Sequence, residues 1–344
     1  MKLEPKNVVE SLHKIMCSST STQADARVDN NDYFKRRVLG FKAEIEFEKL
    51  IENYQNIQFL EGGQLISKAL SGSASDSNKF IYTTLSYDKP EKYLEVYKAV
   101  SNWSDVGEMF YLETNDKWTY GELQVKDTST SPKRAEKILK PSCIFWIYNK
   151  SKAIFEKHIE QDYGCVLSGF ENSGREPSVF PLRKREQFDY FLEYNIDILK
   201  KIYATRYFLD VVLRKASKRK IIDFDGFLKY KQGLSLIEIK EKTPIVGERD
   251  PADQMQWKYG WDSRRILWYL YFSSKINMPI IYNVRHINNR TERKFIQWDS
   301  ITIDTFLSGS DWSKGRGGGG GEDTMLAPYL FFERVEKTLE KLNR

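Results

Sequence analysis

Histidine and cysteine are scarce in this chain of 344 residues, which contains three of each. No two cysteines form a Cys-x-x-Cys pair, and there is no His-Glu-x-x-His motif or Cys/His cluster. A zinc-dependent protease or a zinc-binding module is therefore not expected. An odd number of cysteines also argues against a disulfide framework and favours a reducing, cytoplasmic setting.

Motifs for nucleotides and membranes are missing as well. The sequence has no Gly-x-x-x-x-Gly-Lys-[Ser/Thr] loop and no Gly-x-Gly-x-x-Gly after an apolar strand, so no nucleotide cofactor is predicted. The first residues carry no apolar signal segment. No apolar run approaches the roughly 20 residues that cross a bilayer, so no membrane partner is predicted.

The composition that remains is typical of a folded protein with a slight excess of positive charge. Aromatic residues make up 14% of the chain and charged residues 30%, which indicates a globular protein of one large domain or two. The formal net charge is +6 and the pI is about 8.9. A polyanionic partner is compatible with this charge, but the charge alone does not identify one.

The most informative segment runs from Ile221 to Lys242 and predicts two short strands joined by a tight turn at Lys231-Gln232-Gly233. Glu238 and Lys240 share one face of the second strand because side chains alternate along a strand. With that turn, Asp225 would lie opposite Ile239, within reach of both residues. The segment therefore predicts two carboxylates and an ammonium group at one place.

Such a cluster suits metal-assisted hydrolysis of a phosphodiester. Asp225 and Glu238 would hold Mg²⁺, which prefers carboxylate oxygens. Lys240 would orient a metal-bound water or help to deprotonate it. An ordinary solvated face is the alternative, because Glu-x-Lys-x-Lys is also common on exposed strands.

The spacing of Asp225, Glu238 and Lys240 resembles the PD-(D/E)XK nuclease superfamily, which includes most type II restriction endonucleases. The family's usual proline before the aspartate is Phe224 here. The resemblance implies Mg²⁺-dependent cleavage of double-stranded DNA that leaves a 5′-phosphate. It further implies a helix ahead of the catalytic sheet with an additional glutamate, for which Glu44 is the candidate and Glu48, one turn on, the alternative.

Cationic and polar residues after the hairpin are candidates for contacts with nucleic acid. A helix is predicted over 254–272, followed by strands at 279–284 and 294–298. Gln256 would be an accessory to the site in the family. The candidates for phosphate contacts are Lys258, Arg264, Arg265 and, in a glycine-rich loop, Arg316. A solvated helix face with local ion pairs, and a simple tether in the case of the loop, are the alternatives.

A second strand competes with the hairpin. Asp105 followed by Glu122-Leu123-Gln124-Val125-Lys126 places Glu122, Gln124 and Lys126 on one face. It lacks the strict Glu-x-Lys spacing and the apolar strand before the aspartate. We therefore expect it to belong to a structural or DNA-contacting sheet.

These observations predict an α/β protein with a mixed central sheet flanked by helices, similar to a restriction-endonuclease core, and a large α+β insertion. The predicted parts are an N-terminal helix and linker (1–38), a core helix (39–56), an inserted region for DNA recognition (57–219), a catalytic core (220–305) and a glycine-rich loop with a C-terminal helix (306–344). The predicted function is a site-specific, Mg²⁺-dependent endonuclease, expected to be a homodimer if its sites are palindromic. A non-catalytic nucleic-acid-binding protein and a structural protein with a charged surface are the alternatives.

Overall fold

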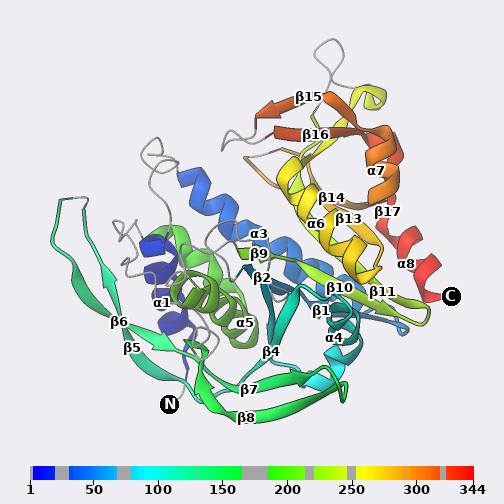
Figure 1. Ribbon diagram of the computed structural model, residues 1–344. Helices are drawn as coiled ribbons and strands as arrows, with labels where there is room; N and C mark the ends of the chain where they lie inside the picture. Colours follow the sequence, from blue (N-terminus) through cyan, green and yellow to red (C-terminus); the bar gives the residue numbers. More distant parts are fainter. Residues whose placement is uncertain are drawn as a thin grey trace. The chain divides into compact units, whose positions relative to one another are not determined.

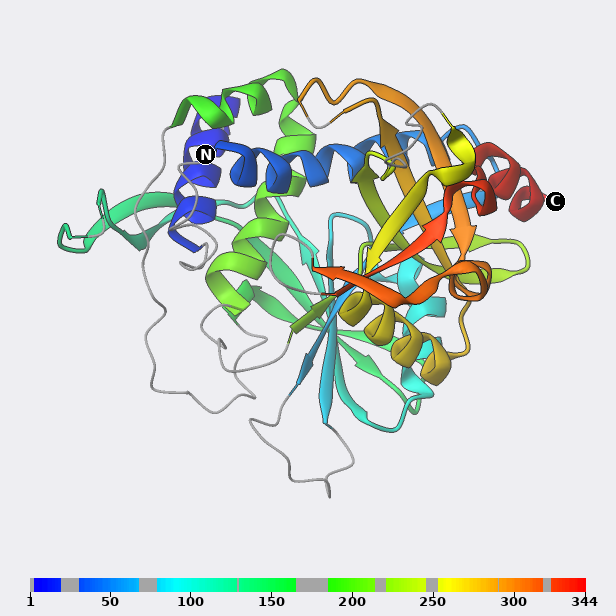
Figure 2. The same cartoon turned by 90° about the horizontal axis from the view of Figure 1, so that it is seen from above.

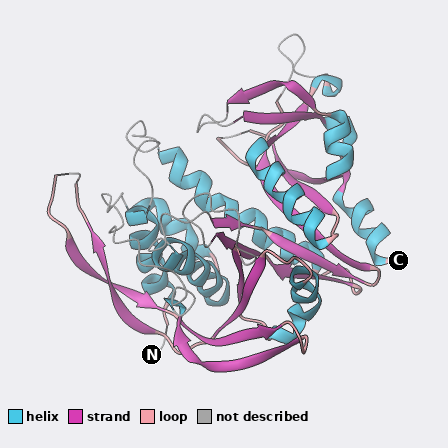
Figure 3. Ribbon diagram, in the orientation of Figure 1, coloured by secondary structure: helices cyan, strands magenta, loops and turns pink. Residues whose placement is uncertain are grey.

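The computed structural model describes residues 3–19, 31–67, 79–128, 130–164, 185–213, 221–245, 253–289, 291–317 and 323–344. The chain divides into two compact units. The first unit comprises 1–37 and 64–222, and the second comprises 38–63 and 223–344. Both units contain helices and strands (Figures 1 and 3), which is compatible with the predicted α/β class.

The first unit contains a six-stranded sheet in the order β8-β7-β4-β3-β2-β9 and a two-stranded ribbon of β5 and β6. Its strands are β2 (Gly63–Ser67), β3 (Phe80–Ser86), β4 (Val106–Thr114), β5 (Thr119–Val125), β6 (Arg134–Lys140), β7 (Ser142–Asn149), β8 (Ile154–Asp162) and β9 (Ile221–Asp223). Its helices are α1 (Pro5–Ser19), η1 (Pro90–Tyr93), α4 (Leu94–Ser101), η3 (Arg185–Glu193), α5 (Ile196–Tyr207) and the π-helix η4 (Phe208–Val212).

Aromatic and β-branched residues explain why the first unit is rich in strands. Segments rich in such residues form β3, β4, β5 and β7. β3 and β4 are parallel, and β4 pairs with β7 in the antiparallel sense, so the sheet is mixed. Every residue of β3 is buried.

The second unit is built on another six-stranded mixed sheet, in the order β1-β10-β11-β13-β14-β17. Its strands are β1 (Ile57–Glu61), β10 (Gly226–Tyr230), β11 (Gly233–Lys242), β13 (Ile280–Ile287), β14 (Phe295–Thr302) and β17 (Glu333–Arg334). A separate three-stranded sheet contains β12 (Lys258–Asp262), β16 (Asp323–Pro328) and β15 (Asp311–Gly317). The helices are α3 (Asn31–Ile51, in this unit from Val38 on), η6 (Gln254–Gln256), α6 (Ser263–Ile276), α7 (Ile303–Gly309), η7 (Tyr329–Phe331) and α8 (Val335–Asn343).

Helices cover both faces of this sheet, with α3 and α6 on opposite sides (Figure 2). On the α3 side, residues spaced four apart in α3 and in α8 form a continuous apolar stripe. They pack against strand residues in one core of Ala43, Phe47, Ile51, Ile57, Leu228, Ile237, Ile239, Ile281, Trp298, Val335 and Leu339. On the α6 side, Phe272 stacks on Phe224 with ring centroids 4.3 Å apart.

Two local expectations differ from the structure. Residues 57–61, predicted to belong to the insertion, form β1, which pairs with β10 of the second unit. The helix predicted over 254–272 begins only at Ser263, and β12 occupies the residues just before it. The aromatic residues Tyr259 and Trp261 are fully or almost fully buried, and their two-residue spacing fits a strand better than a helix.

Asp262 marks the start of α6 because its side chain accepts a hydrogen bond from the backbone N–H of Arg265 at 3.0 Å. At the other end of the helix, Asn277 has φ 52° and ends the helix in the left-handed conformation. Among the described residues, no helix has the length and apolar composition needed to cross a membrane.

Candidate active site

The second strand of the predicted hairpin lies in the middle of the second unit's sheet. β11 pairs with β10 in the antiparallel sense and with β13 in the parallel sense. Its side chains alternate, as predicted, so Glu238 and Lys240 share one face while Ile237 and Ile239 enter the core under α3. The Glu238 side chain is completely buried, so its carboxylate needs partners within the protein.

Asp225 immediately precedes β10, and its carboxylate reaches β11. The predicted register is wrong by one residue: Gly226 pairs with Ile237, so Asp225 does not lie opposite Ile239 as a strand partner. The contact between the two residues forms all the same, because the N–H of Ile239 donates to Asp225 Oδ2 at 2.8 Å. The observed turn contains two residues, Lys231 and Gln232, whereas the predicted turn contained three. A turn that is shorter by one residue shifts the pairing of the two strands by one residue.

Glycines allow the backbone around Asp225 to lie very close to β1. A Cβ on Gly226 would lie 2.7 Å from the Phe59 ring, and a Cβ on Gly62 would lie 1.6 Å from the carbonyl oxygen of Phe224. Real side chains do not tolerate such distances. The absence of a side chain at these two positions thus fixes where Asp225 lies.

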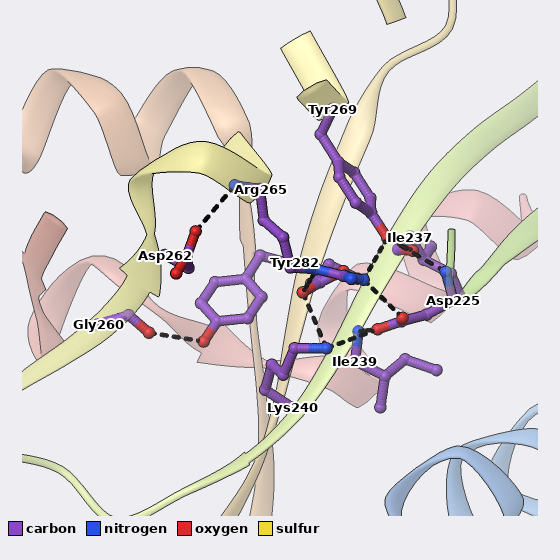
Figure 4. Close-up of polar contacts among 10 residues, drawn as sticks. Asp225, Ile237, Ile239, Lys240, Gly260, Asp262, Arg265, Tyr269 and Tyr282 are labelled. Carbon is purple, nitrogen blue, oxygen red and sulfur yellow. Dashed lines mark hydrogen bonds and ion pairs between the residues drawn. The ribbon is translucent and has the colours of Figure 1, made fainter. Parts of the chain in front are cut away.

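Lys240 joins the two carboxylates, as the sequence predicted. Its Nζ lies 3.1 Å from Asp225 Oδ2 and 2.9 Å from Glu238 Oε1. Figure 4 shows the lysine extending from β11 toward Asp225. The three residues that carry the predicted motif therefore converge in the folded chain.

A second cation, Arg265, also enters the cluster from the first turn of α6 (Figure 4). Its Nη2 donates to Asp225 Oδ1 at 2.7 Å and to Glu238 Oε2 at 2.5 Å, and its Nε donates to Glu238 Oε1 at 2.6 Å. The sequence analysis named Arg265 only as a phosphate contact. The structure instead makes it the main partner of Glu238.

Tyr269, which the sequence analysis did not single out, lies one helical turn after Arg265. Its hydroxyl accepts hydrogen bonds from the backbone N–H of Asp225 at 3.1 Å and from Arg265 Nη2 at 3.3 Å, and lies 3.3 Å from the carbonyl oxygen of Ile237, to which it donates. The i, i+4 spacing of Arg265 and Tyr269 is the signal that could have paired them on one helix face.

Neighbouring charged side chains determine the protonation states of Glu238 and Lys240 on β11. Burial alone would raise the pKa of Glu238, but the charges of Arg265 and Lys240 outweigh it and lower this pKa to about 2. Burial and the charge of Arg265 act against protonation of Lys240, yet the attraction of Asp225 and Glu238 raises its pKa above the usual value. Near neutral pH, Glu238 is thus an anion and Lys240 a cation.

The other two carboxyl groups are shifted in the opposite direction. Burial and the negative charge of Glu238 raise the pKa of Asp225, although Lys240 and Arg265 oppose the shift. Burial and the charge of Asp225 raise the pKa of Glu44 to about 8. Glu44 of α3 therefore belongs electrostatically to the same cluster.

The remaining residues predicted to contact nucleic acid lie on η6, β12, α6 and β15. Gln256 is exposed in η6 and donates to Asp253 Oδ2 at 3.0 Å. Lys258 lies in β12 and Arg264 is exposed in α6. Arg316 falls in β15, but its side chain lies outside the described residues. Arg265 is thus the member of this predicted set that the structure places in the cluster.

The competing motif does not assemble among the described residues. Glu122 and Gln124 are exposed on β5, whose partner in the ribbon is β6. Asp105 precedes β4, which belongs to the six-stranded sheet of the first unit. The two halves of that motif therefore lie in different sheets.

The donor atoms at the site fit a hard divalent cation. Mg²⁺ is commonly held by one or two carboxylates, with water and phosphate oxygens completing its shell. Asp225 and Glu238 provide such a pair. Within the described ranges no three His, Cys, Asp or Glu side chains form a metal-binding group, so the fit is to a carboxylate pair and not to a complete cage.

Comparison with known proteins adds no family to this description. The chain matches no protein-family model, no curated protein and no solved structure.

Proposed function

We propose that this protein is a Mg²⁺-dependent endonuclease that hydrolyses DNA phosphodiester bonds at specific sites, as PD-(D/E)XK restriction enzymes do. The observation that carries the proposal is the position of Lys240, whose Nζ lies within 3.1 Å of a carboxylate oxygen of both Asp225 and Glu238. Buried carboxylates with perturbed pKa values and a shared lysine are typical of catalytic sites.

In this proposal Asp225 and Glu238 bind the metal. The metal would polarise the phosphate and make a water molecule more acidic. Lys240 is a cation near neutral pH, so it donates hydrogen bonds and stabilises negative charge on the reacting phosphate. Its raised pKa makes it a poor proton acceptor, and its expected role is therefore to position the water that attacks.

Glu44 supports the site as a protonated acid. With a pKa of about 8 it keeps its proton near neutral pH. A neutral carboxyl group can donate a hydrogen bond beside Asp225 without adding a third negative charge. We assign this accessory role to Glu44 because the charge of Asp225 contributes to its raised pKa.

The substrate and the assembly follow from the resemblance to restriction enzymes. We infer double-stranded DNA as the substrate, a 5′-phosphate on the product and a homodimer for palindromic sites. The first unit, with its two sheets, is the proposed region for DNA recognition. These inferences rest on analogy with the family.

One observation favours a second candidate, a non-catalytic nucleic-acid-binding protein. Each carboxylate oxygen of Asp225 and Glu238 already contacts a nitrogen of Lys240, Arg265 or both. A closed ion-pair network of this kind can serve structure alone. The binder would show salt-dependent affinity for DNA without metal-dependent cleavage.

Cleavage of unmethylated phage DNA with Mg²⁺ tests the proposal. Wild type is compared with Lys240→Ala, with an EDTA control and with Lys242→Ala, which changes the next lysine on the same face of β11. We expect discrete fragments from wild type and from Lys242→Ala. Lys240→Ala should lower the rate by about 100-fold or more, the usual scale for removing one donor that stabilises a transition state.

The possible results separate the candidates. Equal cutting by wild type and Lys240→Ala would move the active site away from β11. Binding of DNA that weakens with salt, without cutting by any variant, would favour the non-catalytic binder. Cutting that persists in EDTA would contradict the role of the metal.

A further inference from the structure

Arg265 occupies the space between the two carboxylates that the proposed function assigns to a metal. Its Nη2 alone contacts Asp225 Oδ1 and Glu238 Oε2 at 2.7 and 2.5 Å. A planar guanidinium group bridges two carboxylates especially well because its N–H groups form a fixed fork. The arginine therefore supplies the positive charge that holds these two anions together.

The charge count shows why this arrangement matters. Asp225 and Glu238 bring two negative charges when both are ionised, and Lys240 and Arg265 bring two positive charges, so the cluster is neutral. A divalent cation added to it would face two cations already in contact with the same oxygens. Since like charges at such short range repel strongly in a buried site, the cation binds only where a positive group leaves.

Of the two cations, Arg265 is the one whose departure frees an oxygen of each carboxylate. Its Nη2 contacts Asp225 Oδ1 and Glu238 Oε2, whereas Lys240 contacts the other two oxygens, which also accept hydrogen bonds from the N–H of Ile239 and from Arg265 Nε. Arg265 lies in the first turn of α6, and its side chain is about as exposed as that of Lys240, 32% against 33%. It can reach solvent by rotation of its own side chain while Asp262 still caps the helix.

A second buried arginine of the same unit shows what a permanent bridge looks like. Arg285 on β13 donates to Glu46 at 2.5 Å and to Glu241 at 2.8 Å, and 3% of its side chain is exposed. Glu241 also pairs with Arg293. The Arg285 side chain is thus almost completely enclosed, whereas about a third of the Arg265 side chain is exposed.

We propose that Arg265 is a built-in counter-ion of Asp225 and Glu238 that a divalent cation displaces, and that competition with this guanidinium sets the metal affinity of the site. The inference rests on the proposed function only in assigning the metal to these two carboxylates. Once displaced, the guanidinium is free at the mouth of the same site. A phosphate group is the ligand that suits its N–H fork there.

Direct binding of Mn²⁺, measured by calorimetry and by the loss of the free Mn²⁺ electron-spin-resonance signal, tests the inference without any cleavage assay. Wild type is compared with Arg265→Met, which removes the charge but keeps an unbranched side chain. Lys275→Met is the matched control, because it removes an exposed charge from the last turn of α6. We expect Arg265→Met to bind Mn²⁺ about tenfold or more tightly than wild type, and the control to bind as wild type does.

Arg265→Lys provides a second variant should Arg265→Met not fold, as judged by near-ultraviolet circular dichroism. Lysine keeps the charge but cannot form the fork across both carboxylates. We expect Arg265→Lys to bind Mn²⁺ more tightly than wild type, by about threefold.

The outcomes distinguish this inference from the proposed function. Equal or weaker Mn²⁺ binding by the Arg265 variants, with clear binding by wild type, overturns the displacement and leaves the metal site in place. Absence of Mn²⁺ binding by wild type and by every variant overturns the metal site and the inference together. Tighter binding by Arg265→Met without any DNA cleavage would support the inference and contradict the nuclease.

Discussion

Two segments of this chain carry almost the same pattern, an aspartate followed by a strand with glutamate and lysine. The structure places the two strands in different surroundings. In the segment from Asp225 to Lys240, the strand β11 lies between two partners, and Glu238 has no exposed side-chain area. In the segment from Asp105 to Lys126, the strand β5 belongs to a two-stranded ribbon, and Glu122 is exposed.

The difference teaches that the position of a strand in its sheet decides what its charged residues do. On a central strand covered by a helix, an ionised carboxylate has to be paired, and its pKa shifts far from the usual value. Glu238 meets this requirement through Lys240 and Arg265. On a ribbon open to solvent, water satisfies the same group, and no cluster needs to form.

The largest expected effect is on stability and compares Glu238→Gln with Glu122→Gln. Glu238→Gln should lower the free energy of unfolding by about 3–5 kcal/mol, because it leaves two cations with a single carboxylate partner in a buried place. Glu122→Gln should change it by less than about 0.5 kcal/mol, as expected of an exposed residue. Urea denaturation near neutral pH measures both.

The pH dependence of the free energy of unfolding provides a second test with the same two variants. The pKa of Glu238 is lowered from 4.5 to about 2, so its contribution to stability is complete above the unfolded value and is lost as the pH falls toward the folded one. The advantage of wild type over Glu238→Gln should therefore shrink below about pH 4.5. Equal losses for the Glu238 and Glu122 variants would contradict the contrast between the two strands.

Glu44 sharpens the comparison because charged residues of the β11 cluster, Asp225 above all, act on the pKa of this third acid. Its pKa is raised from 4.5 to about 8, so the folded protein binds more protons than the unfolded chain between these values. Stability then falls as the pH rises through that window. Between about pH 5 and pH 8, wild type should lose about 3–4 kcal/mol relative to Glu44→Gln.

Urea denaturation at the two pH values measures this loss, and Glu48→Gln, one turn further along α3, is the control. Glu48→Gln should retain the pH dependence of wild type. A Glu44→Gln variant that still loses stability with pH as wild type does would assign the dependence to another group of the cluster.

The smallest expected effect concerns two glycines next to the acidic residues of the two segments. Gly226 follows Asp225, and Gly121 precedes Glu122. In Gly226→Ala the new methyl group would meet the Phe59 ring at 2.7 Å, whereas in Gly121→Ala it would meet Lys140 at 3.6 Å, an ordinary contact. Gly226→Ala should cost about 1–3 kcal/mol. Gly121→Ala should be neutral or stabilise β5 by about 0.5 kcal/mol.

Thermal and urea denaturation of both variants provide the measurement. A loss of stability in Gly121→Ala as large as that in Gly226→Ala would show that the two segments are packed equally tightly. In that case the contrast between a covered and an open strand would not hold.

The sequence by itself determined the parts of the protein that depend on local pattern. The alternation of side chains along a strand placed Glu238 and Lys240 on one face of β11. The core helix predicted over 39–56 is present as the second part of α3, which ends at Ile51. These features follow from the period of a strand or a helix, which any stretch of sequence displays without its neighbours.

The tertiary structure decided which distant groups meet. Arg265 reaches Asp225 across 40 residues of sequence, and Glu44 reaches the same cluster from a helix near the other end of the chain. The register of β10 on β11 and the strand at Lys258–Asp262 also depended on packing. The physical reason is that burial and charge pairing, which no local period encodes, select the partners of a buried carboxylate.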